Sequence, residues 1–253
     1  MSGRLWRATL LAAALGTSGA AIAGQQCSTE APAVAQVARS MALAERTAAA
    51  LDASGAQVVL LARAGQDLSR WQLRWSHLGW AYRDDAGRWR VMHKLNGCGS
   101  ARGDLYRQGL GEFFLDDMHE YRAAWVVPSA EVQRRLRPLL ADNQRVATLQ
   151  HGPYNMLAYP WSGQYQQSNQ WALETLALAM EPRAATRESA QAWLRLQGYA
   201  PTVLRISTMT RLAANVGQAH IAFDDHPNGD RFAGRIATVT VESVFQWMPR
   251  AGL

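Results

Sequence analysis

The chain has 253 residues, of which 48% are hydrophobic and 18% are charged, so it can bury a large core as one large domain or two small ones. Its formal net charge of +6 is modest, and no cluster of lysine and arginine alternates with aromatic residues, which argues against a nucleic-acid-binding protein. After the N-terminal region, no stretch approaches the roughly 20 apolar residues that a transmembrane helix requires, so we expect no membrane span.

The N-terminus has the pattern of a secretory signal peptide. Arg4 and Arg7 form a positively charged region before a short apolar segment, and residues 21–23 (AIA) match the small-residue cleavage signature. We therefore predict that residues 1–23 are a signal peptide and that residues 24–253 form a single exported domain, periplasmic or secreted. Without Arg4 and Arg7, the excess of basic over acidic side chains falls to +4.

Two cysteines fit an exported protein. Cys27 and Cys98 can form a disulfide bridge between the N-terminal segment and the loop after residue 95, and a closed loop of this size would stabilise the fold by about 4 kcal/mol in the chain-entropy model. The sharper alternative makes Cys98 a reactive nucleophile. Residues 24–26 (GQQ) do not match the small and aliphatic run that lipidation of Cys27 needs, so we expect no lipid anchor.

The first predicted elements are a helix and a strand. Apolar residues recur at helical spacing over residues 32–53, and the Ser-Gly pair that follows ends the helix. Residues 57–62 (QVVLLA) predict a short apolar strand. Residues 67–75 are expected to be irregular or to form one helical turn.

Residues 76–95 (SHLGWAYRDDAGRWRVMHKL) have the pattern of a β-hairpin. In both arms, aromatic and aliphatic side chains follow a pattern with period two. Residues 83–87 supply the turn, in which Gly87 is suited to a positive φ. His77 begins the first arm and His93 lies late in the second, so the two imidazoles can meet across the ladder. The alternative is that both are ordinary sheet histidines with satisfied ring nitrogens.

The segment after the hairpin predicts a loop and then three regular elements. Residues 96–111 contain five glycines and indicate a connection of the kind that is often functional. A short helix over residues 112–118 and a third central strand over residues 121–127 follow. Ser129 then caps a helix that runs to about Ala141.

The second half of the chain predicts an aromatic loop, helices and a β-rich tail. Residues 150–167 indicate an ordered loop with aromatic walls, and a helix opens at Ser168 and ends at residue 180. The remaining expected elements are a helix at 186–197, a strand at 203–206, a short helix at 208–216, a strand at 219–223, a polar loop at 224–234 and an alternating strand at 236–244. Together the elements predict an α+β fold with a mixed, mainly antiparallel sheet packed on helices, with a core at about 56–181 and a helical and β extension at about 182–253.

Three short segments resemble the circularly permuted branch of the papain-like NlpC/P60 superfamily. In that branch a histidine stands before a glycine in a strand, as in residues 76–79 (SHLG), and the nucleophile opens a helix with a large apolar residue three positions later, as in residues 168–171 (SNQW). Residues 152–155 (GPYN) resemble the glycine- and tyrosine-containing run that often precedes the nucleophile. The resemblance covers residues 58–180 and implies a papain-like core.

A second resemblance is closer. The segments LLARAGQDLSRW, HLGWAYRD, HKLN and SNQW are similar to the bacterial family catalogued as domain of unknown function 2145. This resemblance implies an exported protein, but it does not imply any particular activity.

The papain-like resemblance implies catalytic roles for four residues. Ser168 stands where the superfamily has a cysteine, and a serine reacts only if a base removes its proton during attack. His77 would be that base, and His93 would orient it by holding one ring nitrogen. Backbone N–H groups at the helix start, with Asn169, would stabilise an oxyanion. The implied reaction is hydrolysis of an amide or ester in an envelope peptide, glycan or lipid, with no cofactor.

Three other interpretations stay open. Ser168 can serve only as the N-cap of its helix, because serine is among the best capping residues. A catalytically inactive module can use the same cleft to bind an envelope peptide, glycan or lipid between the aromatic walls Trp80, Tyr154, Trp161 and Trp171. An envelope assembly factor would instead act through an exposed C-terminal strand.

Two clusters of acidic residues with histidine can bind a divalent cation in principle. Turn-forming and helix-end residues give the same pattern, so we predict no metal site. The clusters are Asp224, Asp225 and His226, followed by Asp230, and Asp116, Asp117 and His119. We expect structural roles for the remaining histidines, His151 and His220.

Overall fold

A computed structural model describes residues 31–97, 99–116, 118–211 and 220–253. The described helices and strands are, in chain order, α1 (Val34–Ala53), β1 (Val58–Ala64), the 3-10 helix η1 (Ser69–Trp71), β2 (His77–Arg83), β3 (Trp89–Asn96), β4 (Gly103–Gly109), α2 (Leu110–Leu115), β5 (Glu120–Val126), α3 (Ala130–Ala141), α4 (Asn143–Val146), α5 (Ser168–Met180), α6 (Arg187–Leu196), β6 (Thr202–Arg205), α8 (Asn228–Phe232), β7 (Arg235–Thr238) and α9 (Val241–Arg250).

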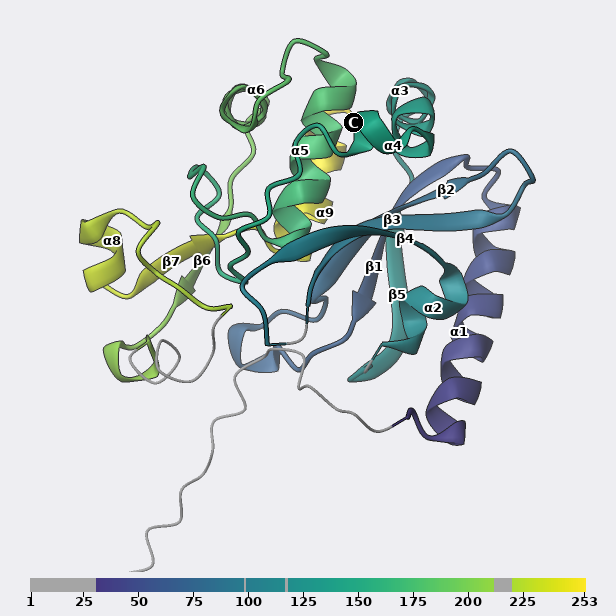
Figure 1. Cartoon of the computed structure of the whole chain (residues 1–253), viewed down its shortest axis with the longest axis horizontal. Coiled ribbons are helices and arrows are strands. Elements are labelled where there is room, and N and C mark those ends of the chain that lie inside the picture. Colours follow the sequence, from purple (N-terminus) through teal and green to yellow (C-terminus); the bar gives the residue numbers. More distant parts are fainter. Residues whose placement is uncertain (1–30, 98, 117, 212–219) are drawn as a thin grey trace, which may run out of the picture.

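Five strands form one sheet in the order β4-β3-β2-β1-β5, and every neighbouring pair is antiparallel. Helices α1 and α2 lie on one side of this sheet, and α3, α5 and α9 lie on the other (Figure 1). This arrangement confirms the predicted α+β class with a mainly antiparallel sheet packed on helices.

Strand β1 shows why both faces of the sheet are covered. All seven of its residues are buried, and all but Arg63 are apolar, as in a strand that is covered on both faces. Leu60 and Ala62 face the core formed with α3, α5 and α9, whereas Val59 and Leu61 face the core formed with α1 and α2. Because side chains alternate along a strand, one apolar segment supports both layers.

The predicted hairpin is confirmed as β2 and β3. Trp80 pairs with Met92 and Ala81 with Val91, and Gly87 in the turn has a φ of +76°. The predicted helices at residues 32–53, 129–141, 168–180 and 186–197 are likewise present as α1, α3, α5 and α6.

Two predictions for the middle of the chain are wrong. The glycine-rich segment 96–111 contains strand β4, in which Leu105 pairs with Lys94 and Gly103 with Asn96. Glycine lowers strand propensity, but the neighbouring strand supplies a ladder of hydrogen bonds that outweighs it. Strand β5 was expected at the centre, yet it is an edge strand beside β1.

The C-terminal region also departs from the prediction. The expected strand at 236–244 ends at Thr238 as β7, and α9 begins at Val241 because the side chain of Thr240 accepts the backbone N–H of Ser243 as an N-cap. Residues 221–223 are not a strand, and the predicted polar loop at 224–234 contains the short helix α8.

Several predictions lie outside the described residues. These are the signal peptide at 1–23, both cysteines of the predicted bridge, Cys27 and Cys98, and most of the helix expected at 208–216. The bridge therefore stays a prediction. Among the helices that the structure describes, none has the length and apolar character needed to cross a membrane.

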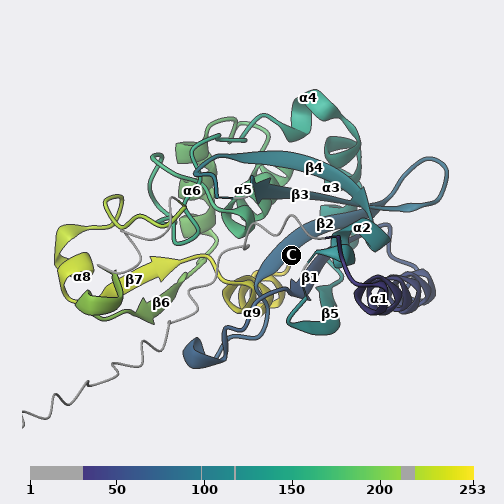
Figure 2. The same ribbon diagram turned by 60° about the horizontal axis from the view of Figure 1, so that its bottom comes forward.

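Strands β6 and β7 pair with each other and, with α8, form a small unit at one end of the molecule, away from α1 (Figures 1 and 2). Its apolar residues form a third core of their own, made of Leu204, Ile206, Ile221, Phe223 and Ile236. We call this part the β6–β7 unit. A hollow between it and the main sheet becomes the candidate site described below.

Gly79 in β2 is predicted to be intolerant of any side chain. A Cβ at this position would lie 2.5 Å from Cγ1 of Val91 and 3.2 Å from Cβ of His93. We expect Gly79→Ala to lower the free energy of unfolding by about 1–3 kcal/mol, as overpacking typically does. The control is Gly229→Ala in α8, where the added Cβ meets nothing within 4 Å and stability should not fall. Urea denaturation of both variants measures this, and equal stabilities would contradict the packing described.

Candidate functional site

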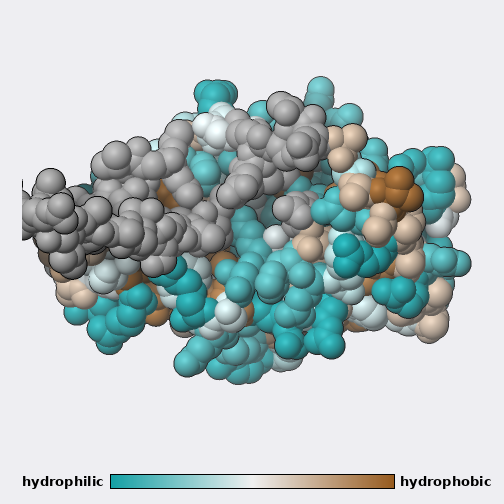
Figure 3. Space-filling view, turned by 90° about the horizontal axis from the view of Figure 1, so that it is seen from below, coloured by the Kyte–Doolittle hydropathy of each residue, from teal (hydrophilic) through white to brown (hydrophobic). Residues whose placement is uncertain are grey.

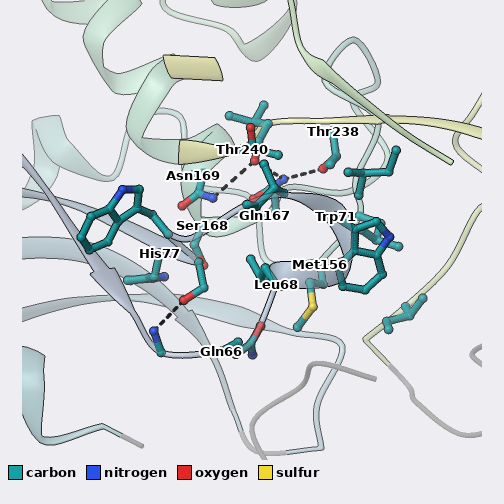
Figure 4. Close-up of a pocket in the computed structure, with 18 of the residues that line it drawn as sticks. Gln66, Leu68, Trp71, His77, Met156, Gln167, Ser168, Asn169, Thr238 and Thr240 are labelled. Atoms are coloured by element: carbon teal, nitrogen blue, oxygen red, sulfur yellow. Dashed lines mark hydrogen bonds between the residues drawn. The ribbon is translucent and has the colours of Figure 1, made fainter. Parts of the chain in front are cut away.

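A cavity of about 290 Å³ lies between the main sheet, the start of α5 and the β6–β7 unit (Figure 4). Residues at the facing ends of β1 and β2, the segment 66–75 and the loop 154–157 complete its walls. His77, Ser168, Asn169 and Tyr154 all line it, so the structure brings these four predicted site residues to one cavity.

A chain of hydrogen bonds runs across three neighbouring strands at the edge of this cavity. Nε2 of His77 in β2 lies 2.8 Å from Nδ1 of His93 in β3, and Nε2 of His93 lies 2.8 Å from Oε1 of Gln108 in β4. The amide oxygen of Gln108 can only accept, so the proton of His93 must sit on Nε2. Nδ1 of His93 then accepts from His77, which leaves Nδ1 of His77 without a proton.

Both imidazoles are held in the neutral form. Burial lowers the pKa of His77 well below its usual value, and the charge of Arg63 and the neighbouring His93 lower it further. Burial and Arg63 also lower the pKa of His93, to about 3, although its bond to Gln108 acts in the opposite direction. A neutral His77 with a free lone pair is the state that a proton acceptor requires.

His77 and α5 approach the cavity from different faces of the sheet. The ring of His77 lies near Phe113 of α2, with 5.9 Å between ring centroids, whereas α5 packs on the opposite face. The link is made at the strand end, where the backbone N–H of Leu78 donates to Oδ1 of Asn169 at 2.8 Å. His77 directly precedes Leu78 in the chain, and Ser168 directly precedes Asn169. The bond therefore brings His77 and Ser168 to the same cavity, as Figure 4 shows.

Ser168 is the first residue of α5 and not its cap, so the N-cap interpretation is wrong. The cap position belongs to Gln167, whose side chain makes no capping bond and instead donates to Thr238 Oγ1 at 2.7 Å and to the carbonyl of Val239 at 3.0 Å. The first N–H groups of a helix have no partner within it. Because the cap position is that of Gln167, the hydroxyl of Ser168 does not cap the helix.

The hydroxyl of Tyr154 lies 3.5 Å from Oγ of Ser168, and among the described residues no hydrogen bond joins Ser168 to His77. Burial raises the pKa of Tyr154, so its hydroxyl stays protonated and can donate. Asn169, predicted to help an oxyanion, uses its amide elsewhere: Oδ1 accepts from Leu78 and Nδ2 donates to the carbonyl of Val239 at 3.3 Å. Its side chain thus links β2, α5 and the segment before α9, and these bonds use Oδ1 and one of the two N–H groups of the amide.

Three of the four predicted aromatic walls lie elsewhere. Trp80 and Trp171 are fully buried in the core between the sheet and α5, where Nε1 of Trp80 donates to the carbonyl of Ala172 at 2.9 Å. Trp161 packs against Tyr199. Tyr154 alone of the four lines the cavity, whose other large aromatic residues are Trp71, Trp75 and Phe223. Density of aromatics along the chain did not indicate which of them reach the cavity.

The predicted acidic and histidine clusters are engaged in structural bonds. Nδ1 of His226 bonds Oδ1 of Asp225 at 2.9 Å, the other Asp225 oxygen accepts the N–H of Tyr159, and Asp224 accepts from Gln164. Among the described residues, no group of three or more His, Cys, Asp and Glu side chains is placed to hold a metal ion. In the second cluster Asp117 lies outside the described residues.

Sequence reasoning missed a buried arginine beside the histidines. Arg63 pairs directly with His77 across β1 and β2, and its guanidinium contacts Asp116 and the carbonyl of Phe113. Arg63 and Asp116 both line the cavity. A charged residue inside the apolar strand VVLLARA was a usable signal, because a buried charge requires a partner.

A second buried charge network lies behind the site. Glu174 accepts two hydrogen bonds from Arg187, one from Gln166 at 2.5 Å and one from Gln191 at 2.9 Å. Gln166 also accepts from Nζ of Lys94 at 2.8 Å. Glu174 interrupts the otherwise apolar helix segment WALETLALAM, which is the same sequence signal of a paired buried charge.

Residues 50–248 match the family described as Uncharacterized protein conserved in bacteria (DUF2145). The chain belongs to this family. No curated protein and no solved structure matches the chain. The matched range of DUF2145 contains every cavity residue discussed above, so the candidate site lies within the family region.

Lys94 gives this DUF2145 protein a built-in titration probe, because it is the single lysine of the chain. Its side chain is fully buried, and burial together with the charge of Arg187 lowers its pKa from 10.5 to about 7. At a pH between these two pKa values, Lys94 is protonated in the unfolded chain and mostly neutral in the folded protein. The free energy of unfolding should therefore rise with pH above about 7, by at most ~1.4 kcal/mol per pH unit.

The pKa of Lys94 can be read from one NMR signal of protein labelled with ¹³C-lysine, and we expect a midpoint near 7. Urea denaturation at about pH 7 and pH 9 should show a rise in stability for the wild type that Lys94→Met lacks. A midpoint near 10.5 would contradict the burial of the amine.

Proposed function

We propose that this protein is an exported hydrolase of amide or ester bonds in the cell envelope, with Ser168 as the nucleophile. The observation that supports this most is the hydrogen-bond chain from Gln108 through His93 to His77, which ends at a cavity that Ser168 also lines. Acyl transfer by serine needs a neutral histidine within reach of the hydroxyl, and here the two groups line one cavity.

The proposed reaction follows from the placement of these groups. Oγ of Ser168 attacks the substrate carbonyl carbon while Nδ1 of His77 accepts its proton. The proton is then given to the leaving nitrogen or oxygen as the carbonyl carbon–heteroatom bond breaks. Water then attacks the acyl carbon while the same nitrogen takes its proton, and this proton passes to Oγ of Ser168 as the bond between Oγ and the acyl group breaks. His93 holds Nε2 of His77 throughout and thereby keeps Nδ1 directed to the reaction.

The developing oxyanion requires donors that are free in the resting site. The first backbone N–H groups of α5 fit this need, because they have no partner within the helix. The hydroxyl of Tyr154 bonds Ser168 at rest and can donate to the oxyanion once Ser168 turns away, whereas Oδ1 and one N–H of the Asn169 amide are already bonded. Each such donor contributes about 3 kcal/mol to the transition state in enzymes of this kind. For catalysis, the hydroxyl of Ser168 must turn from Tyr154 toward His77.

We further propose that the core is a permuted papain-like fold. The histidine strands β2 and β3 precede α5 in the chain, and α5 is tied to β2 by bonds from Leu78 to Asn169 and from Trp80 to Ala172. This order and contact support the resemblance to the permuted NlpC/P60 branch. Periplasmic or secreted localisation rests on the signal-peptide pattern in residues 1–23.

One observation favours a second candidate function, a catalytically inactive module that binds a peptide, glycan or lipid of the envelope. Ser168 is bonded toward Tyr154 and not toward His77 in the described structure. A module that binds without reacting would keep the cavity and need no such bond.

A fluorophosphonate probe separates the two functions. The hydrolase should be labelled at Ser168, identified by peptide mass spectrometry, and Ser168→Ala should abolish labelling without lowering stability much, because Ser168 is not a cap. His77→Gln should slow labelling by about 10²–10⁴-fold, the usual contribution of a general base.

The matched control is Ser162→Ala, which removes a loop hydroxyl outside the cavity and should leave labelling unchanged. A folded wild-type protein that is not labelled, or labelling that persists in Ser168→Ala, would exclude the proposed nucleophile.

A further inference from the structure

We propose that the cavity holds a single hydrocarbon chain, so that the substrate is a fatty-acyl ester or amide whose carbonyl lies at Ser168. The position of the carbonyl rests on the proposed function, whereas the binding of the chain rests on the walls of the cavity. His77, Ser168 and Arg63 line the cavity where it meets the main sheet and α5, and the wall on the side of the β6–β7 unit is mainly apolar, although Arg70 and Thr210 also line the cavity.

The apolar side is built from the third core of the molecule. Leu204, Ile206, Ile221 and Phe223 belong to this core and line the cavity, and the half-buried side chains of Trp71 and Leu73 pack against it from the segment after β1. This core is therefore open toward the cavity. Apolar surface that the fold leaves accessible in a concave site is a common feature of ligand pockets.

Two polar side chains on the same side, Gln167 and Thr240, already have partners within the protein. Nε2 of Gln167 donates to Thr238 Oγ1 and to the carbonyl of Val239, and the hydroxyl of Thr240 bonds that of Thr202 at 2.6 Å. An apolar ligand placed here leaves none of these groups unsatisfied. A peptide, by contrast, would bury amide groups against this wall without partners, which is costly.

The outer surface offers no comparable apolar area where it can be seen. On the face turned toward the viewer in Figure 3, hydrophilic residues predominate among the coloured atoms, and hydrophobic ones occur in small separate areas. Of the large hydrophobic side chains that are exposed, Val34 and Met41 lie in α1, and the others lie in different segments of the chain, such as Leu196 in α6. The cavity thus offers a hydrocarbon a concave apolar wall that the coloured part of this face does not.

The size of the cavity favours one chain. Its volume of about 290 Å³ is at the lower limit of pockets for small molecules, which span roughly 300–1,000 Å³. A two-chain lipid or a glycan with several rings requires more space. A slender acyl chain that enters from the polar end fits both the volume and the change from polar to apolar walls.

Fluorescence titration with cis-parinaric acid tests the binding without chemistry, in Ser168→Ala protein. We expect saturable binding that dodecanoate displaces and butyrate does not. Because each buried methylene contributes about 0.8 kcal/mol, competing alkanoates should bind roughly fourfold tighter per added carbon until the cavity is full.

A matched pair of variants on one strand locates the binding. Leu204 lines the cavity and is 7% exposed, whereas its neighbour Val203 is 51% exposed on the other face of β6. Leu204→Trp should fill the cavity and weaken binding about tenfold or more, while Val203→Trp should change it less than about twofold. Ile221→Trp, from a separate segment, should act as Leu204→Trp does and covers the case in which that variant fails to fold.

The outcomes separate this inference from the hydrolase proposal. Failure of Ser168→Ala to bind parinaric acid, or equal binding by the Leu204 and Val203 variants, would overturn the acyl-chain site even if Ser168 reacts with fluorophosphonate. Binding that is lost in Leu204→Trp, in a protein whose Ser168 is not labelled, would support the acyl-chain site and refute the hydrolase.

Discussion

One hydrogen bond joins the two parts of the chain on which the site depends. The backbone N–H of Leu78 donates to Oδ1 of Asn169 across 91 positions of sequence, and the other amide atom of Asn169 bonds the carbonyl of Val239. The strand with His77, the helix with Ser168 and the segment before α9 are thereby fixed to one buried side chain. Loss of a buried bond of this kind leaves groups unsatisfied, so the geometry of the cavity depends on it.

Buried charge sets the protonation state of the site. Arg63 is almost completely buried next to His77, and its positive charge adds to burial in keeping both imidazoles neutral. Asp116 compensates the charge of Arg63 on the cavity side. Behind the site, the buried carboxylate of Glu174 is compensated by Arg187. Breaking either pair would leave an uncompensated charge in the interior, so the networks specify one arrangement of the strands and α5.

Periodicity predicted most of the fold, because α1, the β2–β3 hairpin, α3, α5 and α6 each carry a complete local pattern. The same reasoning failed where tertiary pairing decides: β4 forms despite its glycines because β3 offers a partner, and residues 236–244 divide at Thr240 because a cap competes with a strand. For the site, spacing predicted that His77 could meet His93, and the bond between them is present. It did not predict Gln108, because this residue lay in the segment expected to be a loop, nor which tryptophans reach the cavity.

The chemistry proposed for this site requires an unprotonated Nδ1 on His77. Long-range ¹H–¹⁵N NMR of the imidazoles measures this directly, with His77→Gln and His93→Gln used to assign the signals. At neutral pH both rings should be neutral, each with its proton on Nε2 and with Nδ1 unprotonated. A proton on Nδ1 of His77, or a positively charged ring at either position, would contradict the hydrogen-bond chain from Gln108 and the role of His77 as a base.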